Sequence, residues 1–164
     1  MSKKPLMKTL VLSDSHVKVQ QMAAIAELVR PDFVMHLGDH AFDLEQLAEL
    51  LKLRLPTTIC TGVTGNDFYD VSEQPERQLL TLCGNKFFLI HGHQYGVKRS
   101  LDSIIYAAQE CEADILLFGH THVPHLSKID DLTILNPGAA NLGYYAVIEI
   151  DDNYKLTTKL YQAK

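Results

Sequence analysis

Five short apolar segments of this 164-residue sequence each lead directly into histidine, aspartate or asparagine. The segments have the length and the aliphatic or aromatic content of buried β-strands. Glycine stands in or beside four of the five polar clusters, where it would let the chain turn sharply. The apolar segments and the polar clusters that follow them are 10–12 with 14–16, 34–37 with 38–39, 59–63 with 65–67, 87–90 with 91–93, and 115–118 with 119–122.

The N-terminal half predicts parallel strands joined by helices. Apolar residues recur at helical spacing over 22–29 and 44–51. Asp43 followed by Gln46 resembles the capping box of the second helix. The predicted strands before, between and after these helices are 9–12, 33–37 and 57–60. Strands that alternate with helices run parallel, because each helix carries the chain back to the same end of the sheet.

The C-terminal half predicts mainly antiparallel strands. Residues 83–85 form a predicted hairpin turn, and Ser100 is positioned to cap a helix over 101–108. The strands expected in this half, with the last four as an antiparallel meander, are 77–82, 86–90, 115–118, 125–129, 132–135, 146–150 and 155–160. The predicted fold class is therefore α/β, mainly parallel in its first half and mainly antiparallel in its second.

The five polar clusters are expected to converge, because the carboxyl ends of strands in an open α/β sheet face one crevice where ligands bind. Together the clusters supply carboxylates, an amide and several imidazoles but no thiolate. Nitrogen and oxygen donors together suit Mn, Fe or Zn. Mg and Ca prefer sites made wholly of oxygen donors, so they fit this set less well. The donors are too many for one tetrahedral ion, so two metal ions that share a bridging carboxylate fit better.

Three of the eight histidines are expected to lie outside the set of metal ligands. His36 falls within an apolar strand, so we expect it to be buried and hydrogen-bonded. His125 follows Pro124 at the start of a strand, which indicates a structural or rim position. His40 directly follows Asp39, and we expect it either behind the ligands or at the surface.

Length and composition indicate a single domain over residues 1–164. The 15 Lys and Arg residues against 20 Asp and Glu residues give a net charge of −5, which argues against general adhesion to nucleic acid or an anionic membrane. No uninterrupted apolar stretch approaches the ~20 residues that a membrane span requires. The three cysteines are odd in number and widely spaced, so neither a disulfide framework nor a zinc knuckle is predicted. We expect a cytoplasmic protein.

The polar clusters contain an ordered set of motifs, namely Asp14-x-His16, Gly38-Asp39, Gly65-Asn66, His91 and Gly119-His120-Thr121-His122. As a set, these motifs resemble those of the calcineurin-like metallophosphoesterases. The further motifs His91-Gly92-His93 and Asn136-Pro137-Gly138 are similar to the small prokaryotic phosphodiesterase branch, which also includes the eukaryotic retromer scaffold Vps29. The resemblance spans residues 8–160, and it implies a four-layer α/β/β/α sandwich of two mixed sheets.

The resemblance also implies a site with two divalent metal ions. Mn is the first expectation, and Ni, Zn, Fe or Mg are the alternatives. A hydroxide that bridges the two ions would attack the phosphorus, because metal binding can lower the pKa of water from ~15.7 to about 7. The implied ligands are Asp14, His16 and His122 for the first ion, Asn66, His91 and His120 for the second, and Asp39 as the bridging carboxylate.

One position departs from the family pattern. Many larger relatives follow Gly-Asn with a histidine that contacts the substrate and can protonate the leaving group, whereas this chain has Asp67 there. Asp67 is a candidate acid, a candidate support for a ligand, or a cap of its loop, and His93 is the alternative proton donor. A general acid typically contributes about 10²–10⁴-fold. Without one, the reaction would be slow or limited to esters with good leaving groups.

The resemblance implies a phosphodiesterase that hydrolyses a small phosphodiester, with Asp39, Asn66, Asp67 and His93 as its catalytic set. Two alternatives stay open: a phosphomonoesterase, and a Vps29-like interaction scaffold with little or no catalysis. The intact ligand set favours an enzyme. Membranes and long nucleic acids are not expected as partners, whereas a homodimer or higher homo-oligomer is. The candidates for an interface or substrate rim, which core packing explains equally well, are Phe68, Tyr69, Tyr144 and Tyr145.

Overall fold

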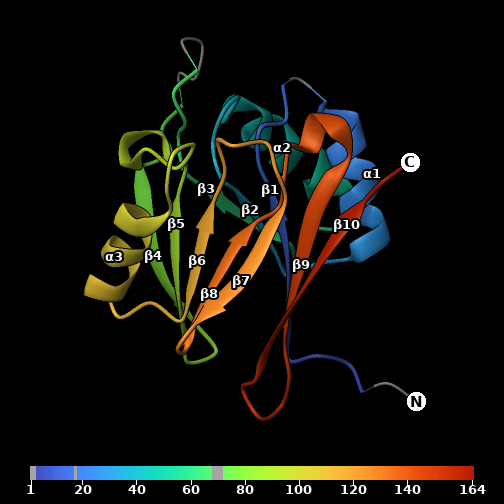
Figure 1. Cartoon of the computed structure of the whole chain (residues 1–164). Coiled ribbons are helices and arrows are strands. Elements are labelled where there is room, and N and C mark those ends of the chain that lie inside the picture. The colour runs from blue at the N-terminus through green and yellow to red at the C-terminus, as the bar shows by residue number, and fades with distance from the viewer. Residues whose placement is uncertain (1–2, 17, 68–71) are drawn as a thin grey trace.

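Two mixed β-sheets pack face to face, and α-helices cover both outer faces of the pair (Figure 1). The computed structural model of the chain describes residues 3–16, 18–67 and 72–164. Within these residues there are two five-stranded sheets and three α-helices. The order of the layers is helices, sheet, sheet and helix, which confirms the predicted α/β/β/α sandwich.

The first sheet contains, in spatial order, β10 (Leu156–Gln162), β9 (Tyr144–Ile150), β1 (Met7–Leu12), β2 (Phe33–His36) and β3 (Ile59–Gly62). Its outer face is covered by two helices, α1 (Val19–Val29) and α2 (Phe42–Arg54). β1, β2 and β3 run parallel to one another, whereas β9 pairs antiparallel with both β1 and β10. The sheet therefore has parallel strands on one side and antiparallel strands on the other.

The second sheet contains, in spatial order, β4 (Arg77–Leu82), β5 (Asn85–Ile90), β6 (Ile115–Phe118), β8 (Leu132–Asn136) and β7 (His125–Ile129). β5, β6 and β8 run parallel, and β4 and β7 pair antiparallel at the two edges. Its outer face is covered by α3 (Asp102–Glu110). Two short 3₁₀ helices lie in connections, η1 (His93–Tyr95) and η2 (Ala140–Leu142).

Three apolar layers fill the spaces between the four layers of secondary structure. Leu10 and Leu12 of β1 pack in the layer with α1 and α2, whereas Val11 between them lies in the layer between the sheets. In β5, Phe87 faces the first sheet and Phe88 lies in the layer with α3. Since successive side chains point to opposite faces, strands buried on both faces have continuous apolar sequences. That property explains why these strands are readily predicted.

The antiparallel meander predicted for the tail is wrong. β7 and β8 form a hairpin in the second sheet, but β8 also pairs parallel with β6. The chain then crosses to the first sheet, where β9 lies between β1 and β10. Most strand pairs of the C-terminal half are nevertheless antiparallel, as predicted, although β5, β6 and β8 form a parallel set inside the second sheet. Turn residues indicate each hairpin locally, but they do not specify which sheet a hairpin joins.

Two helix caps differ from their prediction. α2 begins after Ala41 without a side-chain cap, and Asp43 lies in its first turn, where its carboxylate accepts a 2.7 Å hydrogen bond from Ser15 Oγ. α3 begins at Asp102, although the Ser100 hydroxyl does accept a 3.1 Å hydrogen bond from the Asp102 N–H. No helix in the described part of the chain is long and apolar enough to cross a membrane.

Leu117→Ala should lower the free energy of unfolding by about 2–5 kcal/mol. Leu117 is fully buried between the two sheets, so the truncation leaves a cavity that close-packed layers fill poorly. Leu53→Ala is the matched control: that side chain is 90% exposed on α2, and the change should stay within about 0.5 kcal/mol. Urea unfolding followed by circular dichroism measures both values, and equal losses would contradict the layered packing.

Candidate metal centre

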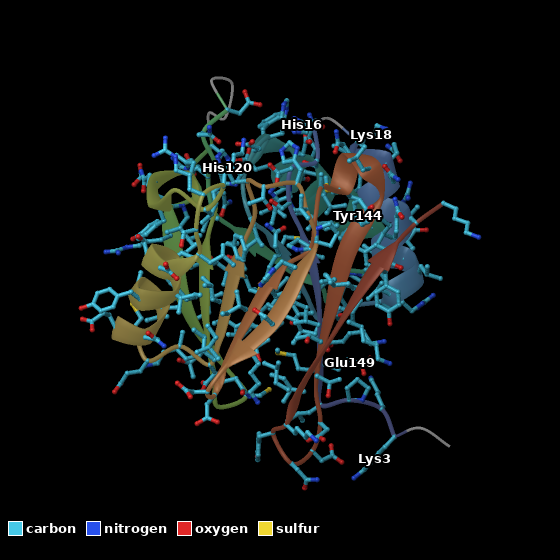
Figure 2. All side chains as sticks on the ribbon, in the orientation of Figure 1. Lys3, His16, Lys18, His120, Tyr144 and Glu149 are labelled. Carbon is cyan, nitrogen blue, oxygen red and sulfur yellow. The ribbon has the colours of Figure 1, made fainter. Side chains whose placement is uncertain are left out.

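The polar strand ends of both sheets meet at one end of the sandwich. β1, β2 and β3 end there from the first sheet and β5 and β6 from the second, and His16 and His120 mark this end in Figure 2. Asp39, which follows β2, lies 3.3 Å from His91, which follows β5, measured from Oδ1 to Nε2. Side chains from the two sheets are therefore in direct contact at this end.

One cluster of candidate ligands contains two carboxylates and two imidazoles. Its ligand atoms all lie within 4.8 Å of one another, and its members are Asp14, His16, Asp39 and His122. His122 Nε2 is 3.1 Å from Asp14 Oδ1, and the ring centroids of His16 and His122 are 5.7 Å apart. Two carboxylates this close repel each other away from water, and a divalent cation between them would remove that repulsion.

A second cluster contains Asp39, His91 and His120, whose ligand atoms also lie within 4.8 Å of one another. His91 Nδ1 is 2.7 Å from the Leu37 carbonyl oxygen, which can only accept, so Nδ1 is the proton donor. Nε2 faces Asp39 Oδ1 at 3.3 Å and His120 Nδ1 at 3.2 Å, and it carries a lone pair once the ring has lost its second proton, as metal binding requires. An imidazole lone pair that faces a carboxylate is an arrangement that a bound cation stabilises.

The Asp14 carboxylate is fully buried. Its Oδ2 accepts hydrogen bonds from Ser13 Oγ (2.5 Å) and from the His120 N–H (3.3 Å). Its Oδ1 receives no aligned hydrogen bond from the described residues, although His122 Nε2 lies 3.1 Å away. Burial raises the pKa of Asp14, and the charge of His91 opposes that rise. A buried oxygen without a donor is unfavourable, and a metal ion would satisfy it.

Asp39 belongs to both clusters and is held in its ionised form. Burial acts to raise its pKa, but the charge of His91 and the backbone N–H groups of Asn66 and Asp67 outweigh burial, so the pKa lies below its usual value. The two N–H groups donate to Asp39 Oδ1 over 3.0 Å and 3.2 Å. An ionised carboxylate shared by two ligand clusters is suited to bridging two metal ions.

Left-handed backbone conformations concentrate in the loops of this site. Such φ angles are uncommon outside glycine. Each costs on the order of 1–3 kcal/mol, and it persists only where the surrounding contacts hold the backbone in place. Five of the seven predicted ligands have a positive φ, namely Asp14 (53°), His16 (45°), Asp39 (56°), His120 (67°) and His122 (62°). Contacts around the loops therefore hold the ligands in conformations that the isolated chain would seldom adopt.

Asn66 and His93 lie beside the clusters. Asn66 is exposed after β3, and it contacts Asp39 through its backbone N–H. His93 lies on η1, with its ring centroid 5.5 Å from that of His91 and 6.1 Å from that of His120. Burial, reinforced by the charge of His91, lowers the pKa of His93. Its Nδ1 is buried without a hydrogen-bond partner among the described residues.

His40 lies within the site, beside Asp67 and His16, whereas the sequence predicts only a position behind the ligands or at the surface. Its Nε2 lies 2.9 Å from Asp67 Oδ2, and its ring centroid is 4.8 Å from that of His16 in an edge-to-face arrangement. His16, His40 and Asp67 form a third group of potential ligand atoms. The pairing joins the loops after β2 and β3, and no local pattern in the sequence predicts a contact between them.

The other two histidines expected outside the ligand set both have hydrogen-bond partners. His36 is fully buried, and its Nε2 lies 2.9 Å from Ser15 Oγ. Burial, followed by the charge of His91, lowers the pKa of His36 to about 3, so its ring is neutral. His125 Nε2 lies 2.8 Å from Ser127 Oγ on β7. Neither residue belongs to a cluster of ligand atoms in the described part of the chain.

The aromatic residues proposed for a rim or an interface have different environments. Tyr145 is buried in the layer between the first sheet and its helices, where its ring stacks on that of Tyr161 with 5.1 Å between centroids. Core packing, rather than an interface, therefore explains Tyr145. Tyr144 is half-buried in the same strand. Phe68 and Tyr69 lie outside the described residues.

Gly65→Ala should weaken the binding of Mn²⁺ by about tenfold or more. A Cβ at this position would overlap Asp39 Oδ1 and the Asp39 backbone nitrogen, so the carboxylate would have to move. Gly84→Ala is the control: its Cβ meets nothing within 4 Å, and its left-handed φ of 75° would lower stability by about 1–2 kcal/mol without touching the site. Calorimetric titration of metal-free protein measures both affinities, and an unchanged affinity in Gly65→Ala would contradict the role of Asp39.

The fold agrees with comparisons to known proteins. The family model of the calcineurin-like phosphoesterase superfamily domain matches residues 7–153. A probable metallophosphoesterase of Mycoplasma pneumoniae is 33% identical over 138 residues, which cover 82% of this chain and 80% of that protein. The crystal structure of a conserved predicted phosphoesterase from Streptococcus pneumoniae has a TM-score of 0.74 and 27% identity, and covers 99% of this chain and 100% of its own.

Vps29 from Entamoeba histolytica, in complex with Zn²⁺, has a TM-score of 0.73 at 21% identity over 95% of this chain and 99% of its own, and this likeness concerns the fold alone. The match to the family model covers most of the chain, including the last candidate ligand loop at His120–His122. This chain therefore belongs to the calcineurin-like phosphoesterase superfamily.

Proposed function

We propose that this protein hydrolyses a small phosphodiester with two bound divalent metal ions, Mn²⁺ first among them. The observation that carries this proposal is the shared carboxylate, because Asp39 belongs to two ligand clusters that each contain two imidazoles. Nitrogen and oxygen donors without a thiolate suit Mn²⁺, with Ni²⁺, Zn²⁺, Fe or Mg²⁺ as alternatives. Membership of a phosphoesterase family whose relatives are named metallophosphoesterases supports the use of metal.

Seven residues would hold the two ions. They are Asp14, His16 and His122 for the first, Asn66, His91 and His120 for the second, and Asp39 for both. When bound, divalent ions supply positive charge for the phosphoryl oxygens and lower the pKa of water toward about 7. The chain orients the donors: the Leu37 carbonyl fixes the His91 ring, and the N–H groups of Asn66 and Asp67 fix the Asp39 carboxylate.

His40, held by Asp67, is the proposed proton donor to the leaving oxygen. The 2.9 Å contact between Asp67 Oδ2 and His40 Nε2 orients the imidazole, so that Nδ1 is left for the substrate. A carboxylate orients histidine in the same way in catalytic triads. Asp67 then acts through His40 rather than as the acid itself. His93, whose ring lies beside those of His91 and His120, is the proposed contact for a phosphoryl oxygen.

A phosphomonoesterase and a Vps29-like scaffold are the two alternatives. Positive charge at a metal centre attracts any phosphate ester, so charge alone does not separate monoesters from diesters. A scaffold does not need metal donors, whereas all seven candidate positions in this chain carry a side chain that can bind a metal. This complete set of donors supports an enzyme over a scaffold.

We also infer a small substrate, a cytoplasmic location and a homodimer or higher homo-oligomer. The net charge of −5 disfavours long nucleic acid as a substrate. Cys60, Cys83 and Cys111 are free thiols, as a reducing compartment maintains. The oligomer is an expectation from the resemblance to small relatives, and light scattering of the purified protein tests it.

Metal-free protein should gain diesterase activity on addition of Mn²⁺, and Asp39→Asn should lose more than about 100-fold of that activity. Loss of a residue that merely supports a metal ligand already costs about 10–100-fold, so loss of the shared carboxylate should cost more. Hydrolysis of bis(p-nitrophenyl) phosphate measures the diesterase rate, and p-nitrophenyl phosphate measures the monoesterase rate under the same conditions.

His125→Gln is the matched control, because this histidine lies against Ser127 Oγ and away from the candidate ligands. It should retain the wild-type rate and metal dependence. Diester hydrolysis that survives exhaustive chelation would refute the proposed mechanism. A faster rate on the monoester would favour the phosphomonoesterase, and uptake of Mn²⁺ without hydrolysis of either ester would favour the scaffold.

His40→Gln should slow the hydrolysis of esters with poor leaving groups selectively. Protonation of an alkoxide by a general acid contributes about 10²–10⁴-fold, whereas p-nitrophenolate leaves without a proton. Rates on a series of aryl and alkyl diesters of rising leaving-group pKa measure this selectivity, and Asp67→Asn should show the same trend in weaker form. A uniform loss across the series would instead assign His40 to substrate binding or metal support.

A further inference from the structure

Three buried polar side chains outside the candidate ligand set form a continuous hydrogen-bonded chain beneath the site. Ser15 Oγ lies 2.9 Å from His36 Nε2 and 2.7 Å from Asp43 Oδ2. Ser15 and His36 are 0% exposed, and Asp43 is 3% exposed. Buried polar groups carry a free-energy penalty unless their hydrogen bonds are made. The Ser15 hydroxyl meets that requirement for two other buried groups at once.

The direction of each hydrogen bond follows from the donors available. The Gly38 N–H donates to His36 Nδ1 over 3.3 Å, so Nδ1 is the acceptor and the neutral ring carries its proton on Nε2. That Nε2–H donates to Ser15 Oγ. The single hydroxyl proton of Ser15 is then left for the Asp43 carboxylate, which accepts it. The chain therefore runs in one direction, from Gly38 through His36 and Ser15 to Asp43.

This chain connects the two loops that carry both carboxylate ligands. Ser15 lies between Asp14 and His16, which have φ angles of 53° and 45°. Gly38, with a φ of 98°, immediately precedes Asp39, with a φ of 56°. Both loops are thus held in left-handed conformations, and the hydrogen bonds through Ser15 tie one loop to the other.

The far end of the chain is anchored on a regular element. Asp43 lies in the first turn of α2, where the N-terminal end of the helix favours a negative charge. α2 packs against the first sheet through Leu44 and Leu47, which are buried in the same apolar layer as Leu10 and Leu12 of β1. The helix therefore offers a fixed point against which a flexible loop can be held.

We propose that Ser15, His36 and Asp43 are positioning residues, which hold the loops of Asp14, His16 and Asp39 in the geometry that binds metal. This inference rests on the proposed metal centre. None of the three acts on the substrate; each acts through the ligand loops. Residues that orient metal ligands typically affect metal affinity by about 10–100-fold when they are removed, and the same range is expected here.

Four variants test this proposal by their affinity for Mn²⁺, measured by calorimetric titration of the metal-free protein. Ser15→Ala removes the hydroxyl, and Asp43→Leu removes the acceptor at the far end. Both should bind Mn²⁺ at least about tenfold more weakly than the wild type. Asp43→Asn loses the charge but keeps an oxygen that accepts from Ser15, so it should stay within about threefold of the wild type.

Thr9→Val is the matched control. Thr9 lies in the same strand that leads to Ser15, and its hydroxyl is buried without a hydrogen-bond partner among the described residues. Removing that hydroxyl should leave the affinity for Mn²⁺ unchanged. Thermal unfolding of each metal-free variant separates loss of stability from loss of affinity. If Ser15→Ala does not fold, the comparison of Asp43→Leu with Asp43→Asn carries the test, because both lie outside the ligand loops.

Weak binding in Ser15→Ala and Asp43→Leu, with near-normal binding in Asp43→Asn and Thr9→Val, is the expected result. Wild-type affinity in Ser15→Ala and Asp43→Leu, with only a lower unfolding temperature, would overturn the proposal. Equally weak binding in Asp43→Leu and Asp43→Asn would overturn it too, since charge rather than the hydrogen bond would then matter. A wild-type protein that binds no Mn²⁺ would refute the metal centre itself, which distinguishes that failure from the failure of this network.

The tautomer of His36 provides a second, spectroscopic readout. Long-range ¹H–¹⁵N correlation of metal-free protein should find the His36 proton on Nε2, as the hydrogen bond from the Gly38 N–H requires. A proton on Nδ1 would oppose the Gly38 N–H and break the direction of the chain. That result would overturn the assignment whatever the metal affinities of the variants.

Discussion

Two buried carboxylates lie together where the two sheets meet, and much of the surrounding structure holds them in place. Asp14 is fully buried and Asp39 is 8% exposed, so water screens their repulsion poorly. His91 and His122, which lie against them, come from the second sheet. The carboxylates and their partners therefore meet only when both sheets pack through their shared apolar layer. Folding of the sandwich and assembly of the site depend on the same contacts.

The close approach of like charges is maintained by hydrogen bonds from several directions. Backbone N–H groups of the β3 loop fix Asp39, Ser13 and the His120 N–H fix Asp14, and the Leu37 carbonyl fixes the ring of His91. These contacts hold ligand loops whose backbone is left-handed at five of the seven candidate positions. Such pre-organisation is what a metal site needs if its donors are not to rearrange when an ion binds.

Much of this arrangement is predictable from the sequence, because the inner strands are buried on both faces. Their continuous apolar runs reveal where each strand ends, and the parallel order of β1, β2 and β3 brings those ends together. The positions of Asp14 and Asp39 follow from this rule, whereas His91 reaches them through the packing of the second sheet against the first. Which sheet each hairpin of the C-terminal tail joins is not predictable in this way. Hairpin turns are local signals, whereas long-range packing determines the sheet that a hairpin joins.

Contacts between loops are the part that the sequence does not reveal. His40 meets Asp67 from another loop, and Ser15 meets Asp43, which lies 28 residues away in the first turn of α2. Asp43 resembles a helix cap in the sequence, yet its carboxylate accepts from Ser15 and the helix has no side-chain cap. Local pattern assigns such a residue to the nearest element, whereas the fold gives it a partner that only the tertiary structure brings near.

The number of metal ions bound by each chain is the most direct test of this account. Native mass spectrometry of metal-free protein reconstituted with Mn²⁺ counts the ions without any assumption about the substrate. Two ions in the wild-type chain, and at most one in Asp39→Asn, are the predicted result. A wild-type chain that binds one ion or none at saturation would contradict a centre in which Asp39 is shared by two ligand clusters.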